Sequence, residues 1–431
     1  MNFHSLRTPE TQLDFKTVLF QGLSPDGSLF VPESLPKLDS KRLTQMESLH
    51  RVATTVLAPF IPDIEEAKLH ALLEKAWDFP IPLQTLDDDL FLIEEFHGPT
   101  LAFKDLGARF MAAMMDHYLE KEGRKVTILV ATSGDTGSAV AHGFFGAKNI
   151  DVFVLYPSGK VSPLQEKQMT TLGGNITAIE VTGNFDDCQA LVKQALQDAE
   201  LVSKLGLTTA NSINMGRLLP QIVFYVWAWV QWETSGGLYD PTPPSIVVPS
   251  GNFGNLTACL YAKEMGIPIG PVVAATNANR VVPDYIRTGE YDPKPTLHTH
   301  SSAMDVGDPS NWTRIAHLFE EDWARMRSAI HAVTVPDNQT LKEIKDTLDR
   351  TGILLDPHTA VGVYAARNLK DRPAFVAATA HPAKFPEVIK AATGKEFDMP
   401  EALAKIAGGE KQSVTMENDY AAWRTFLEAR V

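Results

Sequence analysis

Cysteine is scarce in this 431-residue sequence. Two cysteines, Cys188 and Cys259, are too few for a disulfide framework in a chain of this size. Nothing near either residue in the sequence indicates the activating base of a nucleophilic thiol. We therefore expect neither a disulfide-stapled fold nor thiol catalysis.

Basic residues and long apolar runs are also scarce. The chain has 39 Lys and Arg against 53 Asp and Glu, a formal net charge of −14, and so lacks the basic footprint that nucleic acids and anionic membranes require. The longest apolar run, 222–230, is about half the length of a membrane span. The first residues have no apolar signal-peptide core. We expect no nucleic-acid or membrane partner, and a cytoplasmic location.

A metal site is not expected either. His298 and His300 lie in an irregular stretch and lack the further ligands and the spacing of a zinc site.

What the sequence does contain is a repeated alternation of short apolar runs and helical stretches. Continuous β-branched runs predict buried strands, and helices are expected between them. The α/β class follows, with parallel sheets covered on both faces and ligands bound beyond the carboxyl ends of the strands. The predicted strands are 125–131, 151–156, 175–181, 245–249, 271–276 and 374–380.

Changes in pattern divide the chain into four parts. Residues 1–90 form a mainly helical N-terminal segment, 91–235 and 245–400 form two α/β lobes, and 401–431 form a helical tail. The Pro- and Gly-rich stretch 234–245 is the internal boundary. A second irregular stretch, 287–311, is long for a loop and is a candidate lid or insertion.

Two glycine-containing turns between a strand and a helix favour anions. Residues 133–137 read SGDTG and residues 250–255 read SGNFGN. Glycine lets the backbone approach a ligand closely, and the free N–H groups at a helix start favour negative charge. The first turn by itself is explained equally well as a helix cap. Together, on separate α/β halves, the two turns predict a cleft that holds two anionic groups.

Lys104 is the candidate reactive amine. A lone lysine is ordinarily a solvated surface residue, but here Leu101, Ala102 and Phe103 precede it and an apolar helix face follows. Partial desolvation and the positive end of a helix both lower a lysine pKa, and a lysine so tuned can form a Schiff base. A Schiff-base lysine with two anion sites describes a pyridoxal phosphate enzyme acting on an anionic substrate.

At these residues the sequence resembles the threonine synthase family, over nearly the whole chain. The family belongs to the tryptophan-synthase-β-like pyridoxal phosphate enzymes, in which the cofactor lies between two α/β lobes. The motifs that carry the resemblance occur in family order: QGLSPDGSLFVPE, GPTLAFKD, TSGDTGSA, SPLQEKQMTTLGGN, NSINMGR, VPSGNFGN, SAMDVGDP followed by SNWTR, and TAHPAKFPE.

The resemblance implies roles for the cofactor-binding residues. Lys104 is the Schiff-base lysine and the acid/base on the substrate. The phosphate cradle is formed mostly by backbone N–H groups of Gly251, Asn252, Phe253, Gly254 and Asn255. Asp135 lies close to the cofactor's 3′-oxygen, where a carboxylate would need to share a proton. Thr379 is the neighbour of the pyridine nitrogen, and its hydroxyl does not enforce ring protonation.

The resemblance also implies the substrate and its site. O-phosphohomoserine loses its γ-phosphate, and water then adds at Cβ to give L-threonine. The substrate phosphate is expected near Thr136, Asn211, Ser212 and Arg217, and Lys160 is a weaker candidate for the same task. Arg217 can bind phosphate bidentately; without the resemblance, a surface salt bridge would be the preferred interpretation. His381 is either structural or close to the cofactor.

Two alternatives keep the same fold. One is a threonine-synthase-like phospho-lyase that releases 2-oxobutyrate, or a serine/threonine dehydratase, although the phosphate-site residues disfavour a dehydratase. The other is a non-catalytic protein that binds pyridoxal phosphate or a nucleotide. Retention of Lys104 and both turns argues against this second alternative. The sequence predicts no oligomeric state.

Overall fold

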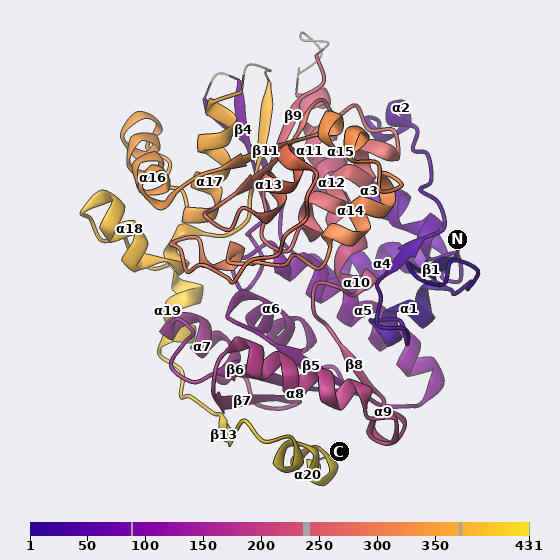
Figure 1. Ribbon diagram of the computed structural model, residues 1–431. Coiled ribbons are helices and arrows are strands. Elements are labelled where there is room, and N and C mark those ends of the chain that lie inside the picture. The colour runs from indigo at the N-terminus through magenta and orange to yellow at the C-terminus, as the bar shows by residue number, and fades with distance from the viewer. Residues whose placement is uncertain (88, 236–241, 370–372, 431) are drawn as a thin grey trace.

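Two β-sheets organise the chain, which a computed structural model describes over residues 1–87, 89–235, 242–369 and 373–430. Each sheet is the centre of one α/β lobe, and the N-terminal segment lies beside both of them (Figure 1). Residues 236–241 of the predicted boundary stretch lie outside the described residues.

The larger lobe contains a six-stranded sheet with the order β11-β10-β9-β12-β4-β3. Five of its strands are parallel, and β3 pairs with β4 in the antiparallel sense. The strands are β3 (Leu83–Asp87), β4 (Leu90–Glu94), β9 (Ser245–Pro249), β10 (Val272–Thr276), β11 (Ile330–Thr334) and β12 (Ala374–Ala378).

The smaller lobe contains a five-stranded, fully parallel sheet with the order β13-β7-β6-β5-β8. Its outermost strand, β13, comes from the end of the chain, which returns past α19 to this lobe (Figure 1). The strands are β5 (Val126–Ala131), β6 (Ile150–Pro157), β7 (Ile176–Thr182), β8 (Leu207–Thr209) and β13 (Val414–Glu417).

Helices cover both faces of each sheet, as continuous apolar strands require. In β9, Ile246 and Val248 pack in the core that includes α11 and α12, whereas Val247 packs with α17 on the other face. The helices of the two lobes are α5 (Lys104–Glu122), α6 (Asp135–Phe144), α7 (Pro163–Thr170), α8 (Phe185–Gln197), α9 (Ala199–Leu205), α10 (Met215–Leu218), α11 (Ile222–Thr234), α12 (Gly254–Glu264), α13 (Val281–Thr288), α14 (Trp312–Leu318), α15 (Trp323–Ala329), α16 (Asp337–Thr351), α17 (Pro357–Arg367), α18 (Pro386–Thr393), α19 (Glu401–Ala407) and α20 (Tyr420–Arg430).

The N-terminal segment supports α5, the helix that begins at Lys104. Trp77 is fully buried, packs 6.2 Å from the ring of Phe110 in α5, and donates its indole N–H to the carbonyl of Leu106 at 3.0 Å. Phe15 lies on the same Phe110 ring at 6.2 Å. The segment contains β1 (Phe3–Ser5), α1 (Phe15–Gln21), β2 (Phe30–Pro32), α2 (Ser40–Leu43), α3 (Leu49–Leu57) and α4 (Glu66–Ala76).

The strands predicted from apolar runs all exist, each within a few residues of the predicted bounds. The sequence analysis did not identify β1, β2, β3, β4, β8, β11 and β13, which are short or carry positions that are not buried. Sheet membership does not follow the expected ranges, because β4 pairs in the larger sheet and β13 pairs in the smaller one. The described part of the chain has no helix that is both long and apolar enough to cross a membrane.

Candidate functional site

Lys104 is placed by two short segments that pair with each other. The N–H of Phe103 donates to the carbonyl of Thr379 at 2.9 Å, and the N–H of His381 donates to the carbonyl of Leu101 at 3.1 Å. Leu101 has a φ of 56°, so the chain turns sharply before α5 begins. This pairing joins the end of β12 to the start of α5 and holds Lys104 near Thr379.

The amine of Lys104 lies in a mostly buried, charged environment. Its side chain is 16 % exposed, and its Nζ lies 3.9 Å from Asp135 Oδ2. Burial lowers the pKa of Lys104; the charge of Asp135 opposes this shift, and those of Lys384 and Arg217 reinforce it. A lowered pKa increases the fraction of free amine near neutral pH, which a nucleophilic lysine needs.

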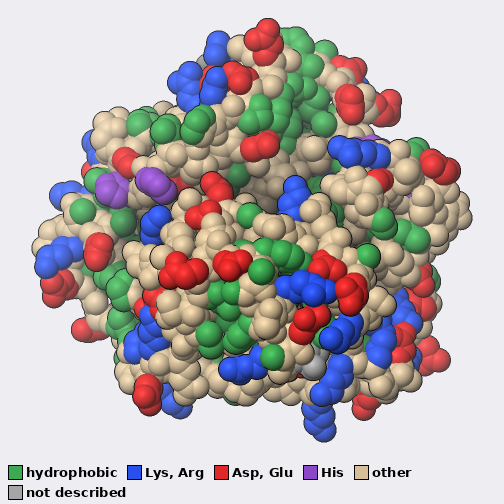
Figure 2. All heavy atoms as spheres, turned by 60° about the horizontal axis from the view of Figure 1, so that its bottom comes forward, with side chains coloured by type: hydrophobic (Ala, Val, Ile, Leu, Met, Phe, Trp, Pro, Cys, Tyr) green, Lys and Arg blue, Asp and Glu red, His purple; other side chains and the backbone are tan. Residues whose placement is uncertain are grey.

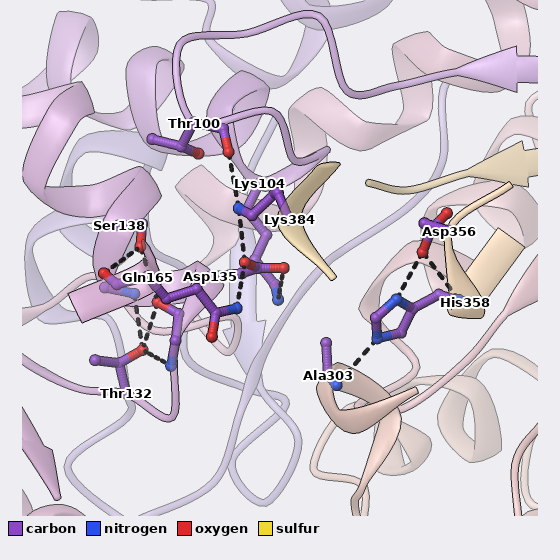
Figure 3. A network of polar contacts seen from close by, with 12 residues as sticks. Thr100, Lys104, Thr132, Asp135, Ser138, Gln165, Ala303, Asp356, His358 and Lys384 are labelled. Carbon is purple, nitrogen blue, oxygen red and sulfur yellow. Dashed lines mark hydrogen bonds and ion pairs between the residues drawn. The ribbon is translucent and has the colours of Figure 1, made fainter. Parts of the chain in front are cut away.

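Asp135 is the buried carboxylate that faces this amine. It starts α6, directly after the turn that follows β5, and is 6 % exposed. Its Oδ1 lies 2.7 Å from Lys384 Nζ and accepts a hydrogen bond from Gln165 Nε2 at 2.8 Å (Figure 3). Burial alone would raise the pKa of Asp135, but the charges of Lys384 and Lys104 and these two hydrogen bonds lower it overall. Asp135 is therefore ionised.

The turn before Asp135 is tied together by one threonine. Thr132 Oγ1 accepts hydrogen bonds from the N–H groups of Gly134 and Gly137, both at 2.9 Å (Figure 3). Gly134 has a φ of 150°, and a Cβ there would come within 2.5 Å of Gln165 Oε1. Only glycine satisfies both conditions, which explains the residue preceding Asp135.

The second glycine turn connects β9 to α12 and leaves its N–H groups available. Phe253, the residue before α12, has a φ of 61°, and no side chain caps the helix start. The first N–H groups of a helix have no intrahelical acceptor, so they can bind an anion. Gly251 permits close packing here, because a Cβ at that position would come within 2.7 Å of the backbone of Met304.

The asparagine side chains of this turn form hydrogen bonds with other side chains of the protein. Asn252 donates to Ser212 Oγ at 2.6 Å, which connects the turn of the larger lobe to the segment after β8 of the smaller lobe. Asn255 donates to Glu95 Oε2 at 2.8 Å and accepts a hydrogen bond from the hydroxyl of Tyr225. The turn is thus held by its side chains and offers its backbone N–H groups.

Arg217 is buried beneath the start of α5, which overturns the surface salt bridge that the sequence pattern alone favours. It is 3 % exposed and donates to the carbonyls of Ala210 at 2.6 Å and Lys104 at 3.4 Å, and its Nε has no partner among the described residues. Burial lowers its pKa to about 10. Lys160 is exposed in the turn after β6.

The other expected substrate residues lie at the carboxyl end of the smaller sheet. Asn211 follows β8 and donates to the carbonyl of Ala131, the last residue of β5, at 3.3 Å. Thr136 follows Asp135 in the first turn of α6. The structure therefore brings Thr136, Asn211 and Ser212 to one edge of the sheet, and Ser212 lies against Asn252 of the other lobe.

His381 has a structural partner: its Nδ1 accepts the N–H of Ala383 at 3.1 Å. Its ring packs edge-on against Phe96, with the centroids 5.6 Å apart.

Seen in space-filling view, one face of the molecule is hollowed, with side chains of both charge signs around the hollow (Figure 2).

Comparison with known proteins assigns this arrangement to a family. The family model described as pyridoxal-phosphate dependent enzyme matches residues 77–379, and those of the threonine synthase N terminus and C-terminal region match residues 2–77 and 359–427. The threonine synthase of Haemophilus influenzae is 42 % identical over 435 residues, covering 99 % of each chain. The chain belongs to the threonine synthase family.

Solved structures of the family have the same fold over the whole chain. The crystal structure of threonine synthase from Escherichia coli has a TM-score of 0.92 at 40 % identity and covers 100 % of both chains. A pyridoxal-phosphate-bound threonine synthase from Brucella melitensis has a TM-score of 0.93 at 35 % identity, also with full coverage. The predicted family, α/β fold, cofactor and lyase activity are confirmed.

The residues present fit the cofactor of the threonine synthase family. The uncapped start of α12 suits the cofactor phosphate, and the buried amine of Lys104 suits the cofactor aldehyde. The sequence analysis missed Lys384, Gln165 and Glu95 as residues around this site. Lys384 and Gln165 lie inside the family motifs TAHPAKFPE and SPLQEKQMTTLGGN, which could have identified them, whereas Glu95 has no such signal.

Proposed function

We propose that this chain converts O-phosphohomoserine and water into L-threonine and phosphate, with Lys104 as the catalytic residue. The observation that carries the proposal is the position of Lys104: a buried amine at a helix start, 3.9 Å from an ionised carboxylate, next to Thr379 of the other lobe. Bound pyridoxal phosphate would withdraw electrons from the substrate's α-carbon and so would make the proton on that carbon more acidic.

Lys104 has two tasks in this proposal. Its amine holds the cofactor until the substrate's amino group replaces it, and the freed amine then moves protons on the substrate. The reaction removes protons from Cα and Cβ, releases phosphate from Cγ, returns protons to Cγ and Cα, and adds the hydroxyl group of water at Cβ, while the remaining proton of that water balances the released phosphate. One mobile lysine within hydrogen-bond reach can serve several of these steps, and its lowered pKa favours the free base.

The proposal places the cofactor phosphate and the substrate phosphate in two separate anion sites. The backbone N–H groups of residues 251–255 are proposed to hold the cofactor phosphate, because the turn is uncapped and its asparagine side chains are already bonded. Thr136, Asn211, Ser212 and Arg217 are proposed to hold the substrate phosphate. The hydrogen bond between Ser212 and Asn252 supports this division, since it makes the two sites neighbours.

Asp135 and Thr379 are proposed to contact the cofactor ring, at its 3′-oxygen and its pyridine nitrogen. Both lie beside Lys104: Asp135 faces its amine at 3.9 Å, and the carbonyl of Thr379 accepts the N–H of Phe103, the residue before Lys104. The expected shared proton at Asp135 is not required, because Lys384 and Gln165 already stabilise its negative charge. The net charge of −14 supports the absence of nucleic-acid and anionic-membrane partners.

The test is to incubate the purified protein with pyridoxal phosphate and O-phosphohomoserine and to measure phosphate and amino-acid product together. Equal amounts of phosphate and L-threonine are expected, with both lost in Lys104→Ala. Lys121→Ala, an exposed lysine on the same helix, is the matched control and should leave both unchanged. Phosphate with 2-oxobutyrate would replace the proposal with the phospho-lyase, and no turnover would point to a binding protein.

A further inference from the structure

Lys384 is a second lysine in the site, and the proposed mechanism gives it no task beyond stabilising the charge of Asp135. It ends the short 3-10 helix η5 (Pro382–Lys384) after β12, and its side chain is fully buried. Its Nζ donates to the carbonyl of Thr100 at 2.7 Å and lies 2.7 Å from Asp135 Oδ1 (Figure 3). Burying an ammonium group costs free energy unless it is paired, so this position calls for a physical reason.

The two lysines share one carboxylate unequally. Lys384 contacts Asp135 at 2.7 Å, whereas Lys104 lies 3.9 Å from the other oxygen of the same carboxylate. Gln165 donates to the oxygen that Lys384 also contacts. Charge attraction increases as distance falls, so the carboxylate is compensated mainly by Lys384. Lys104 therefore faces a carboxylate whose charge another cation already compensates in part.

We propose that Lys384 is a positioning residue: it compensates the charge of Asp135, so that this carboxylate does not hold Lys104 as its own ion-pair partner. The inference deepens the proposed function and rests on the role of Lys104 in it. Without Lys384, Asp135 would keep Lys104 in its ammonium form, and the reactive amine would be less available.

The other charges near these two lysines come from several elements. Besides Asp135, the groups that act on Lys104 are Lys384 and Arg217. Around Lys384, the carboxylate of Asp105 lies on α5, and the imidazoles of His142 and His381 lie on α6 and beside η5. Asp135 is the only carboxylate among the groups that act on Lys104 within the described residues, so removing its compensation acts directly on that amine.

Three variants isolate this effect. Lys384→Met keeps an unbranched side chain without charge, Asp135→Asn removes the carboxylate, and the double variant removes both charges. Lys390→Met is the matched control, because Lys390 is an exposed lysine on the next helix, α18, with its ion pair to Glu396 at the surface. Far-UV circular dichroism and thermal unfolding establish that each variant folds.

The readout is the pKa of Lys104 in the full-length protein freed of cofactor. A small amine-reactive acetylating reagent is added between pH 6 and pH 11, and the rate of Lys104 acetylation is measured by mass spectrometry. Losing a neighbouring compensating charge should raise the pKa of Lys104 in Lys384→Met by about one unit and slow its acetylation about tenfold near neutral pH. Asp135→Asn should lower that pKa, and the double variant should lie between these two single variants.

Added pyridoxal phosphate provides a second readout, the pH at which the absorbance band of the lysine-bound cofactor develops. This midpoint should move in the same directions as the acetylation midpoint. An unchanged Lys104 pKa in a folded Lys384→Met protein would overturn the proposal. If Lys384→Met does not fold, Lys384→Gln, which keeps a donor for the carbonyl of Thr100 but carries no charge, takes its place, and an unchanged Lys104 pKa in that folded variant would overturn the proposal.

The acetylation experiment is independent of the proposed reaction, because it contains no substrate. Failure to form threonine would remove the proposed function and leave the coupling between Lys384, Asp135 and Lys104 as measured. A normal threonine yield together with an unchanged Lys104 pKa in Lys384→Met would support the proposed function and remove the proposed role of Lys384.

Discussion

Replacement of Glu95 by Gln should make the protein more stable than the wild type as the pH rises. Glu95 follows β4, is 1 % exposed, and accepts a hydrogen bond from Asn255 Nδ2 through Oε2. Its Oε1 is buried without a partner among the described residues. Burial raises the pKa of Glu95 well above its ordinary value of 4.5, against the smaller effect of the Asn255 hydrogen bond. Glutamine keeps the shape and an acceptor for Asn255 but has no proton to lose.

The size of the effect follows from proton linkage. Below pH 4.5 both folded and unfolded wild-type chains keep the Glu95 proton, so the stability gained from the raised pKa is fully present. Above that pH the unfolded chain loses its proton while the folded chain keeps it. The free energy of unfolding of the wild type therefore falls, relative to Glu95→Gln, by about 1.4 kcal/mol per pH unit until the folded-state pKa is reached.

The assay is thermal unfolding of both proteins in one cofactor state between pH 5 and pH 8. An unfolding entropy of about 2.1 cal/mol/K per residue over 431 residues is about 0.9 kcal/mol/K, so the difference in Tm should grow by about 1.5 °C per pH unit. Glu33→Gln, an exposed site, is the control and should show a constant difference. A constant difference for Glu95→Gln as well would refute the reasoning, because Glu95 would then be ionised in the folded protein.

Substitutions at three further positions test the first glycine turn, the substrate site and a buried histidine of the larger lobe. Gly134→Ala should destabilise the protein by about 2 kcal/mol or more, because of its φ of 150° and the predicted contact with Gln165; an unchanged Tm would contradict this. Arg217→Lys should lower kcat/KM for O-phosphohomoserine by about 100-fold, chiefly through KM, with the cofactor absorbance retained; a normal KM would remove Arg217 from the substrate site. His358→Ala should cost about 1–3 kcal/mol, since the buried His358 ring contacts the buried carboxylate of Asp356 at 2.7 Å through Nδ1 and accepts the N–H of Ala303 at 3.1 Å through Nε2 (Figure 3). His358→Gln should cost less, and equal Tm losses would count against this account.

Several features of this protein could be predicted from the sequence because their cause is local. A run such as 245–249 is apolar at every position, and this pattern predicts a strand buried on both faces wherever it occurs. A glycine turn between such a strand and a helix predicts an anion site for the same local reason. Lys104 was identified in this way, from an apolar flank and a helix start. The family resemblance then supplied the cofactor and the reaction.

The tertiary structure alone decided which charges face Lys104. Lys384 lies inside a family motif, but nothing in the motif shows that its side chain is fully buried and bonds to Thr100, 284 residues earlier in the chain. Likewise, Arg217 is buried against α5, and Glu95 is paired with Asn255, 160 residues away. These contacts depend on how strands distant in sequence are ordered within two sheets. Local composition determines where a strand forms, but which strands become neighbours, and therefore which charged groups meet beside them, is set by the packing of the whole chain.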